Sequence, residues 1–305
     1  MRPPYKCLLA ATVLLVPCIA LESTRNSRSV DSAHLPVPFH VERLSPSDLE
    51  VGGELAGLPP GTTRYITRDD LLTLPQASYT VTGDANFARP TQIRGVLLKE
   101  LIRHVGAAPE SDLIVAICRD QYRANYPRAY IAAHHPLLVL TINGKPPAGW
   151  PKNAEGHGVD MGPYMISHPT FTPRFKSLSD RDEPQIPWGV IRIEFRDEKA
   201  VFGTIVPRGP HAAEPAVQSG YRIARQNCFR CHDMGGEGGQ KSGYPWPVLA
   251  AWATASPHHF AAYVHDPQAS DPHAQMPGNP DYDAATVQSL IAYFQTFSPQ
   301  GKEKP

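Results

Sequence analysis

The stretch Cys228-Phe229-Arg230-Cys231-His232 decides how the second half of this chain is interpreted. Two thiols three positions apart, followed directly by an imidazole, are typical of covalent haem c attachment. Each sulfur adds to one haem vinyl group, and the histidine binds the iron. The alternatives are a zinc site or a disulfide. A four-cysteine zinc site needs a second cysteine pair, which the sequence lacks. A thioredoxin-like motif would follow a strand, whereas the residues before Cys228 indicate a helix.

Two helical segments flank this motif. Residues 214–226 have an apolar face and run directly into Cys228. Residues 286–297 carry a second apolar stripe, with Asp283 as the predicted N-cap and Pro299 after the end. The C-terminal part of the chain is therefore predicted to be helical.

Met276 lies between these helices in the polar segment Met276-Pro277-Gly278. A thioether is a soft ligand that suits low-spin haem iron, and a methionine in such a loop has little packing reason to be there. We expect Met276 to be the second axial ligand. In the alternative, Met276 is a surface residue and His265 or His273 binds the iron.

These features make residues 212–300 resemble the class I cytochromes c. The resemblance implies an all-α domain whose first and last helices cross at Gly220 and Tyr293. It also implies that the carbonyl of Pro247 orients His232. The matching positions are Gly220, Tyr221, Cys228, Cys231, His232, Pro247, Leu249, Met276, Pro277, Leu290 and Tyr293.

Composition places the chain among ordinary globular proteins. It has 305 residues, 41% of them hydrophobic, and a formal net charge of zero. This length suits two domains, and the absence of a basic excess gives no indication of a nucleic-acid partner. The 33 prolines predict many extended segments and turns.

The N-terminus has the features of a secretory signal. Residues 1–20 combine two basic residues, an apolar core and a cleavage site predicted after Ala20. Pro17 disfavours lipid attachment at Cys18. The apolar core is too short to span a bilayer, so membrane association would require that this segment is retained as an anchor. We therefore expect a periplasmic, exported protein, with residues 21–35 disordered.

Residues 36–206 are predicted to form a separate α+β or mainly β domain. The patterns indicate buried strands at 113–118 and 137–142, the latter closed by an Asn143-Gly144 turn, and an amphipathic helix over 92–105. The remaining expected elements are strands at 65–67, 78–83, 191–195 and 201–205, and a helix at 69–74. Residues 207–215 are predicted to be an exposed, semi-rigid linker to a domain at 216–300.

This N-terminal region resembles the molybdopterin-binding domain of the sulfite oxidase superfamily in a short form. The resemblance implies that Cys118, at the end of a strand, binds molybdenum through its thiolate, which is a suitable soft ligand. The positions that carry it are Gly95 to Leu98, Cys118, Asp120 to Tyr122, Asn143 to Pro146, Gly162 to Ile166, Trp188, Ile191 and Ile193.

The sequence departs from that family after its Gly-Pro pair, where Tyr164 replaces a frequent arginine. The residues that hold the pterin and its phosphate are not evident. Candidates near Cys118 are basic, and each has the alternative of being a surface or packing residue. They are Arg119, Arg123, Arg128, His134, His135 and His157.

Smaller features concern the surroundings of the haem. The glycine-rich segment 235–239 is not a phosphate loop, because no strand precedes it, and we expect it to wrap the haem edge. Tyr244, Trp246 and Trp252 are expected to contact the haem or its propionates, with plain core packing as the alternative.

The sequence leaves two candidate functions. The first is an exported c-type cytochrome with one haem c, bound at Cys228, Cys231, His232 and Met276, that exchanges electrons with a periplasmic redox protein or respiratory-chain component. The second is a molybdenum-dependent oxidoreductase in which the haem relays electrons to or from a centre at Cys118. The metal content of the purified protein would discriminate the cytochrome from the molybdenum-dependent oxidoreductase. We prefer the cytochrome.

Overall fold

The computed structural model describes residues 37–82, 84–154, 158–169 and 185–298. These residues belong to one compact unit. The predicted signal peptide, its cleavage site and the segment 21–35 lie outside the described residues, as does His157. Among the described residues, no helix combines the length and apolar character that crossing a bilayer requires.

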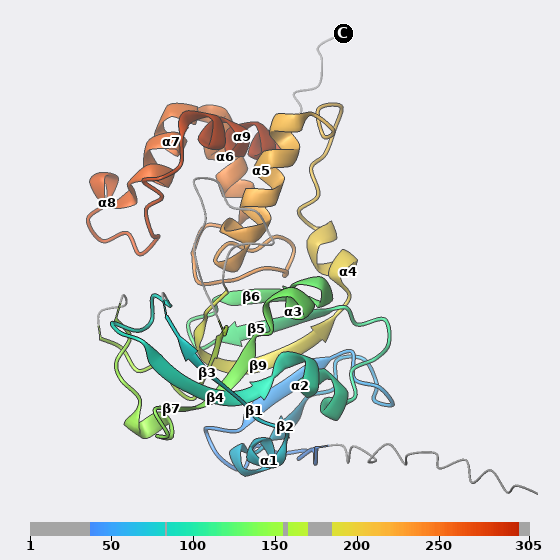
Figure 1. The fold of residues 1–305 in the computed structure, drawn as a ribbon. Coiled ribbons are helices and arrows are strands. Elements are labelled where there is room, and N and C mark those ends of the chain that lie inside the picture. Colours follow the sequence, from blue (N-terminus) through green and yellow to red (C-terminus); the bar gives the residue numbers. More distant parts are fainter. Residues whose placement is uncertain (1–36, 83, 155–157, 170–184, 299–305) are drawn as a thin grey trace, which may run out of the picture. The chain divides into compact units, whose positions relative to one another are not determined.

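The N-terminal part is built on a mixed sheet (Figure 1). Its strand order is β2-β1-β9-β8-β7-β4-β3, and β5 pairs with β9 and with β6. The pairing of β1 with β9 is parallel, and the other strand pairs among the described residues are antiparallel. The strands are β1 (Leu49–Gly53), β2 (Arg64–Ile66), β3 (Ala77–Val81), β4 (Thr91–Leu97), β5 (Leu113–Cys118), β6 (Arg123–Pro127), β7 (Leu137–Ile142), β8 (Tyr164–Ser167) and β9 (Trp188–Arg196).

Among its described residues, this part also has the short α-helices α1 (Arg68–Thr73), α2 (Leu98–Val105), α3 (Arg128–His134) and α4 (Glu198–Gly203). Leu71 of α1, Leu101 of α2 and Ile131 of α3 pack into one apolar core with the strands. A second cluster forms around Ile93, Val139 and Met165. The mixed α/β character predicted from the sequence is therefore confirmed.

Two predicted elements of this region were wrong. Residues 92–105 are not one helix, because Thr91–Leu97 forms β4 and only Leu98–Val105 is helical. Gly95 allows β4 to approach β7 closely, because a Cβ there would lie 1.9 Å from the carbonyl oxygen of Leu138. Residues 201–205 do not return as a strand, because Asp197 caps a helix by accepting a hydrogen bond from the Ala200 amide.

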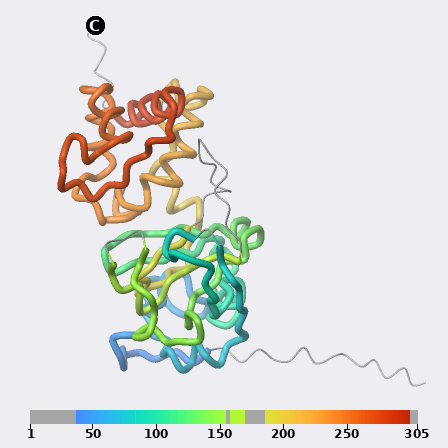
Figure 2. The backbone as a smooth tube through the Cα atoms, turned by 60° about the vertical axis from the view of Figure 1, so that its left-hand side comes forward, coloured from blue at the N-terminus to red at the C-terminus, as the bar shows by residue number. Residues whose placement is uncertain are grey.

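The C-terminal part is helical, as predicted (Figure 2). It contains α5 (Pro215–Gln226), the 3₁₀ turn η2 (Cys228–Arg230), α6 (Trp246–Ala255), α7 (Pro257–His265), α8 (Pro267–Ser270) and α9 (Ala284–Gln295). Helices α5 and α9 cross at Gly220, where a Cβ would lie 2.0 Å from the Ser289 carbonyl oxygen and 2.7 Å from Tyr293 Cβ. The predicted crossing of Gly220 and Tyr293 is confirmed.

The two parts share apolar packing through β5. Alternate residues of β5 point to opposite faces of the strand. Ile114, Ala116 and Cys118 lie in the core of the sheet. Leu113, Val115 and Ile117 instead lie in the core of the helical part, with Phe229 and Trp246.

The predicted linker 207–215 is mostly exposed, but Pro207 is buried. Just before it, Val201, Phe202 and Ile205 pack into the core of the helical part. The sequence interpretation of two domains joined by an exposed tether therefore missed this shared core.

Candidate haem-binding site

The predicted attachment cysteines lie directly after α5, on the turn η2. The amides of Cys231 and His232 both donate to the Cys228 carbonyl, at 3.1 and 2.9 Å. This tight turn brings both thiols and the imidazole to one short piece of backbone. Both thiols are free. Burial raises the pKa of Cys228 to about 12 and also raises the pKa of Cys231, so both are thiols at neutral pH.

His232 is held in a defined orientation. Its Nδ1 lies 2.6 Å from the carbonyl oxygen of Tyr244. A carbonyl only accepts, so Nδ1 carries the proton and Nε2 keeps its lone pair for a metal. Burial lowers the pKa of His232, which favours the neutral form that ligates iron. The resemblance had assigned this carbonyl to Pro247. That prediction was wrong, because Tyr244 supplies it.

The glycine-rich segment wraps the motif. Gly235 and Gly236 have φ of 62° and 86°, and they close a turn in which Met234 and Glu237 pair. A Cβ at Gly238 would lie 2.6 Å from the Phe229 ring and 2.8 Å from the His232 carbonyl oxygen. Only a residue without a side chain allows the backbone to approach this closely.

Met276 lies in the loop after α8, partly buried against the same core as Cys228. Its carbonyl accepts a hydrogen bond from Gln268 Nε2 at 2.9 Å, and Asn279 ties the loop to the end of α7. The alternative ligand His265 uses its Nε2 on the Pro280 carbonyl at 3.1 Å, and His273 is exposed. Axial ligation by Met276 stays a prediction.

The predicted aromatic contacts divide into two groups. Trp246 is fully buried among Phe229, Tyr293 and Phe294, which is core packing. Tyr244 is 47% exposed and contacts Trp252 with ring centroids 5.0 Å apart.

The residues around Cys228 fit a haem c group. Two reduced, unpaired thiols and a neutral imidazole with a free Nε2 are the donor set that this group needs. Among the described residues, no group of three or more His, Cys, Asp or Glu is arranged to hold a metal ion.

Cys118 lies at the end of β5, as predicted, but its surroundings differ from a metal site. Its side chain is in the apolar core of the sheet and the residue is 2% exposed. Its pKa is raised far above the usual range, chiefly by burial.

The basic residues proposed for the pterin are already engaged within the protein. Arg119 donates to the Asp160 carbonyl at 2.9 Å, Arg123 donates to the Gly236 carbonyl at 3.3 Å, and Arg128 donates twice to the Ser111 carbonyl. His134 packs on the Tyr130 ring, and His135 is exposed. The described residues therefore do not fit a molybdopterin at Cys118.

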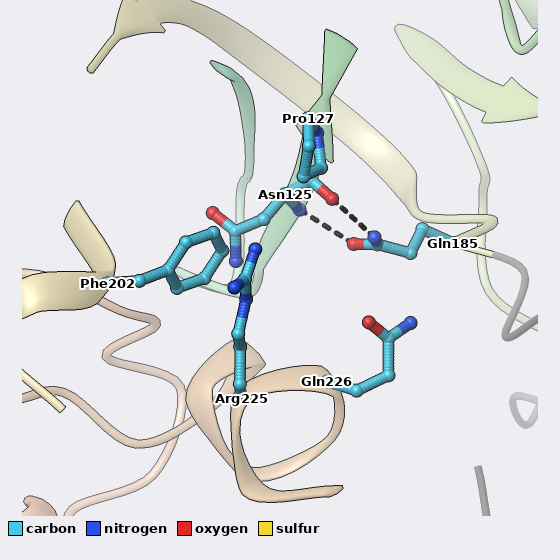
Figure 3. A pocket seen from close by; sticks show the side chains of 6 residues that line it. All are labelled: Asn125, Pro127, Gln185, Phe202, Arg225 and Gln226. Carbon is cyan, nitrogen blue, oxygen red and sulfur yellow. Dashed lines mark hydrogen bonds between the residues drawn. The ribbon is translucent and has the colours of Figure 1, made fainter. Parts of the chain in front are cut away.

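A small pocket lies elsewhere, between β6, α4 and α5 (Figure 3). Asn125 and Gln185 hydrogen-bond to each other on one side of it. On the other side, the Arg225 guanidinium lies 3.7 Å from the centre of the Phe202 ring and pairs with Glu198. None of the predicted site residues lines this pocket.

A comparison with known protein families agrees with a haem-binding site in the helical C-terminal part. The helical fold and the fixed orientation of His232 are those that a cytochrome c domain requires. Residues 215–294 match the family model described as cytochrome C oxidase, cbb3-type, subunit III. The C-terminal part of this chain is therefore a cytochrome c domain.

One solved structure is similar over a larger part of the chain. It is the sulfane dehydrogenase SoxCD from Paracoccus pantotrophus, with 14% sequence identity and a TM-score of 0.31. The similarity covers 56% of this chain and 45% of that chain, which is less than half of its length. No curated protein sequence matches this chain.

Proposed function

We propose that this chain is an exported c-type cytochrome that carries one covalent haem c and exchanges electrons with a periplasmic redox protein or a respiratory-chain component. The observation that carries the proposal is the hydrogen bond from His232 Nδ1 to the Tyr244 carbonyl, beside two free thiols. The family match over 215–294 supports the same conclusion.

The roles of the residues follow from their chemistry. A bound haem c would supply a one-electron couple at its iron. Cys228 and Cys231 would hold it covalently, and His232 and Met276 would ligate the iron. Tyr244 keeps the His232 ring fixed, so little rearrangement of this ligand is needed when the iron changes charge. The burial of Phe229 and Trp246 beside the motif excludes water from that side.

The test is covalent haem retention by the full-length protein produced in a host that matures c-type cytochromes. We expect the haem to stay with the chain in a denaturing gel. Cys228→Ala and Cys231→Ala should weaken this retention, and Cys118→Ala is the matched control that should leave it unchanged. A colourless secreted protein would refute the proposal. Fractionation tests the export reading separately, since a haem-bearing cytosolic pool would contradict it.

A further inference from the structure

We infer that the N-terminal domain is a docking platform that holds the haem-binding loop of its own chain over Cys118. The loop is defined here as residues 229–241. The inference rests on the proposed function only in that this loop is taken to carry the haem. It assigns the platform to the outer face of β5, to the two ion pairs of Glu237, and to two polar contacts made by Gln240 and Lys241.

The first part of the platform is apolar. Leu113, Val115 and Ile117 of β5 are at most 8% exposed and pack with the core that contains Phe229. A strand on the outside of an independent domain would show polar residues on its solvent face. Here all six residues of β5 are buried. The strand is thus covered on both faces, and the helical part supplies one of the covers.

The second part is ionic and centres on Glu237. Its carboxylate pairs with Arg196 of β9 and lies 3.6 Å from Arg123 of β6. The Glu237 side chain is 17% exposed. Because partly buried ion pairs are screened less than surface pairs, this contact fixes the position of the loop. Glu237 is therefore a positioning residue, which acts on the haem motif through the loop.

The third part closes the loop over the turn that follows Cys118. The Gln240 amide donates to the Gln121 carbonyl at 3.0 Å, and Lys241 Nζ lies 2.7 Å from Asp120 Oδ2. Lys241 and Cys231 are both close enough to influence Cys118 electrostatically. A ligand that reached this sulfur past residues 120–121 would have to displace the haem-binding loop.

The platform explains why the thiol and the basic residues around it do not fit a molybdopterin. Arg123 pairs with Glu237 and Lys241 pairs with Asp120, so both charges lie in contacts between the sheet part and the loop. Neither charge is then directed at a phosphate. The N-terminal domain then contributes a fixed position for the loop. This differs from a tethered pair of domains, in which the linker alone would keep the two parts close.

The first test is elemental analysis of the purified full-length protein, produced with molybdate in the medium. We expect about one iron atom per protein chain and no stoichiometric molybdenum. Iron together with an equal amount of molybdenum would overturn the inference and leave the cytochrome proposal standing. Absence of iron would instead refute the cytochrome proposal.

The second test measures hydrogen exchange at the Gln240 amide in Glu237→Gln and in the control Glu50→Gln. Glu50 of β1 pairs with Arg43, which precedes the sheet, and with Arg192 of β9, and it is 18% exposed, so it matches Glu237 closely. We expect exchange at Gln240 to be roughly tenfold faster in Glu237→Gln and unchanged in Glu50→Gln. Wild-type exchange at amides of α9 in both variants shows that they fold, and Glu237→Asp should restore part of the protection at Gln240. Equal exchange in Glu237→Gln and the wild type would overturn the role of Glu237.

Discussion

The imidazole Nδ1 of His232 lies 2.6 Å from the carbonyl oxygen of Tyr244, twelve residues further along the chain. The acceptor is a main-chain atom, so the ring orientation depends on the backbone path between the motif and α6. Trp246, which begins α6, is fully buried and donates its amide to the Asp233 carbonyl at 2.8 Å, which fixes that path. The proximal histidine is therefore positioned by the fold of its own loop.

Met276→Ala should remove the sulfur-to-iron absorption feature of the oxidised protein, because the proposed distal thioether is then absent. The reduction potential should fall, since a methionine axial ligand raises it. Met234→Ala is the control, because Met234 packs against the same core as Met276 and Cys228. An unchanged spectrum in Met276→Ala would exclude this ligand and point to His265 or His273.

Gly220→Ala should destabilise the cytochrome c domain by about 1–3 kcal/mol, because overpacking at a close helix crossing forces the backbones apart. The new Cβ would lie 2.0 Å from the Ser289 carbonyl oxygen. Gly243→Ala is the control, because nothing lies within 4 Å of a Cβ there. Denaturant unfolding measures both, and equal midpoints for the two variants would contradict the crossing.

The sequence predicted best the elements whose pattern is local. Residues 113–118 and 137–142 were assigned as strands with the observed bounds, because short apolar runs rich in β-branched residues and bounded by turn signals are typical of buried strands. Residues 92–105 were misassigned, because a strand that runs directly into a helix gives one continuous apolar pattern. The boundary there is set by the pairing of β4 with β7, which is not local.

The residues of the candidate site also divide into those that a local sequence pattern indicates and those that only the fold brings together. Cys228, Cys231 and His232 were identified because covalent haem attachment requires this spacing in the sequence. The Tyr244 carbonyl was missed because every residue has a carbonyl, and only the fold selects one. Glu237 was missed because its partners Arg123 and Arg196 lie far away in sequence, so no spacing indicates them.

Asp283→Ala should lower the free energy of unfolding by about 1 kcal/mol, because it removes the N-cap of α9. Asp283 Oδ1 accepts a hydrogen bond from the Thr286 amide at 2.8 Å. Asp283→Asn keeps an oxygen acceptor and should cost only a few tenths of that value. Thermal unfolding with haem attached provides the measurement. A loss in Asp283→Asn as large as that in Asp283→Ala would show that the charge matters more than the cap.

The stability of the sheet domain should fall with acid because of His168. This residue is 2% exposed, and its Nε2 lies 2.8 Å from the Tyr130 hydroxyl. Burial, assisted by the nearby His134, lowers the pKa of His168 to about 3, so the folded protein keeps this ring neutral. In the unfolded chain a histidine takes up its proton near pH 6.5, so this stability is present above that pH.

As pH falls from about 6.5 towards 3, only the unfolded state gains this proton, and the contribution declines by up to about 1.4 kcal/mol per pH unit. His168→Gln keeps a hydrogen-bond acceptor for Tyr130 but cannot be protonated in this range, so its unfolding free energy should decline less steeply with acid. The exposed His258 provides the control His258→Gln, which should retain the wild-type slope. Urea unfolding at a series of pH values measures all three, and parallel curves for His168→Gln and wild type would show that His168 does not control this acid sensitivity.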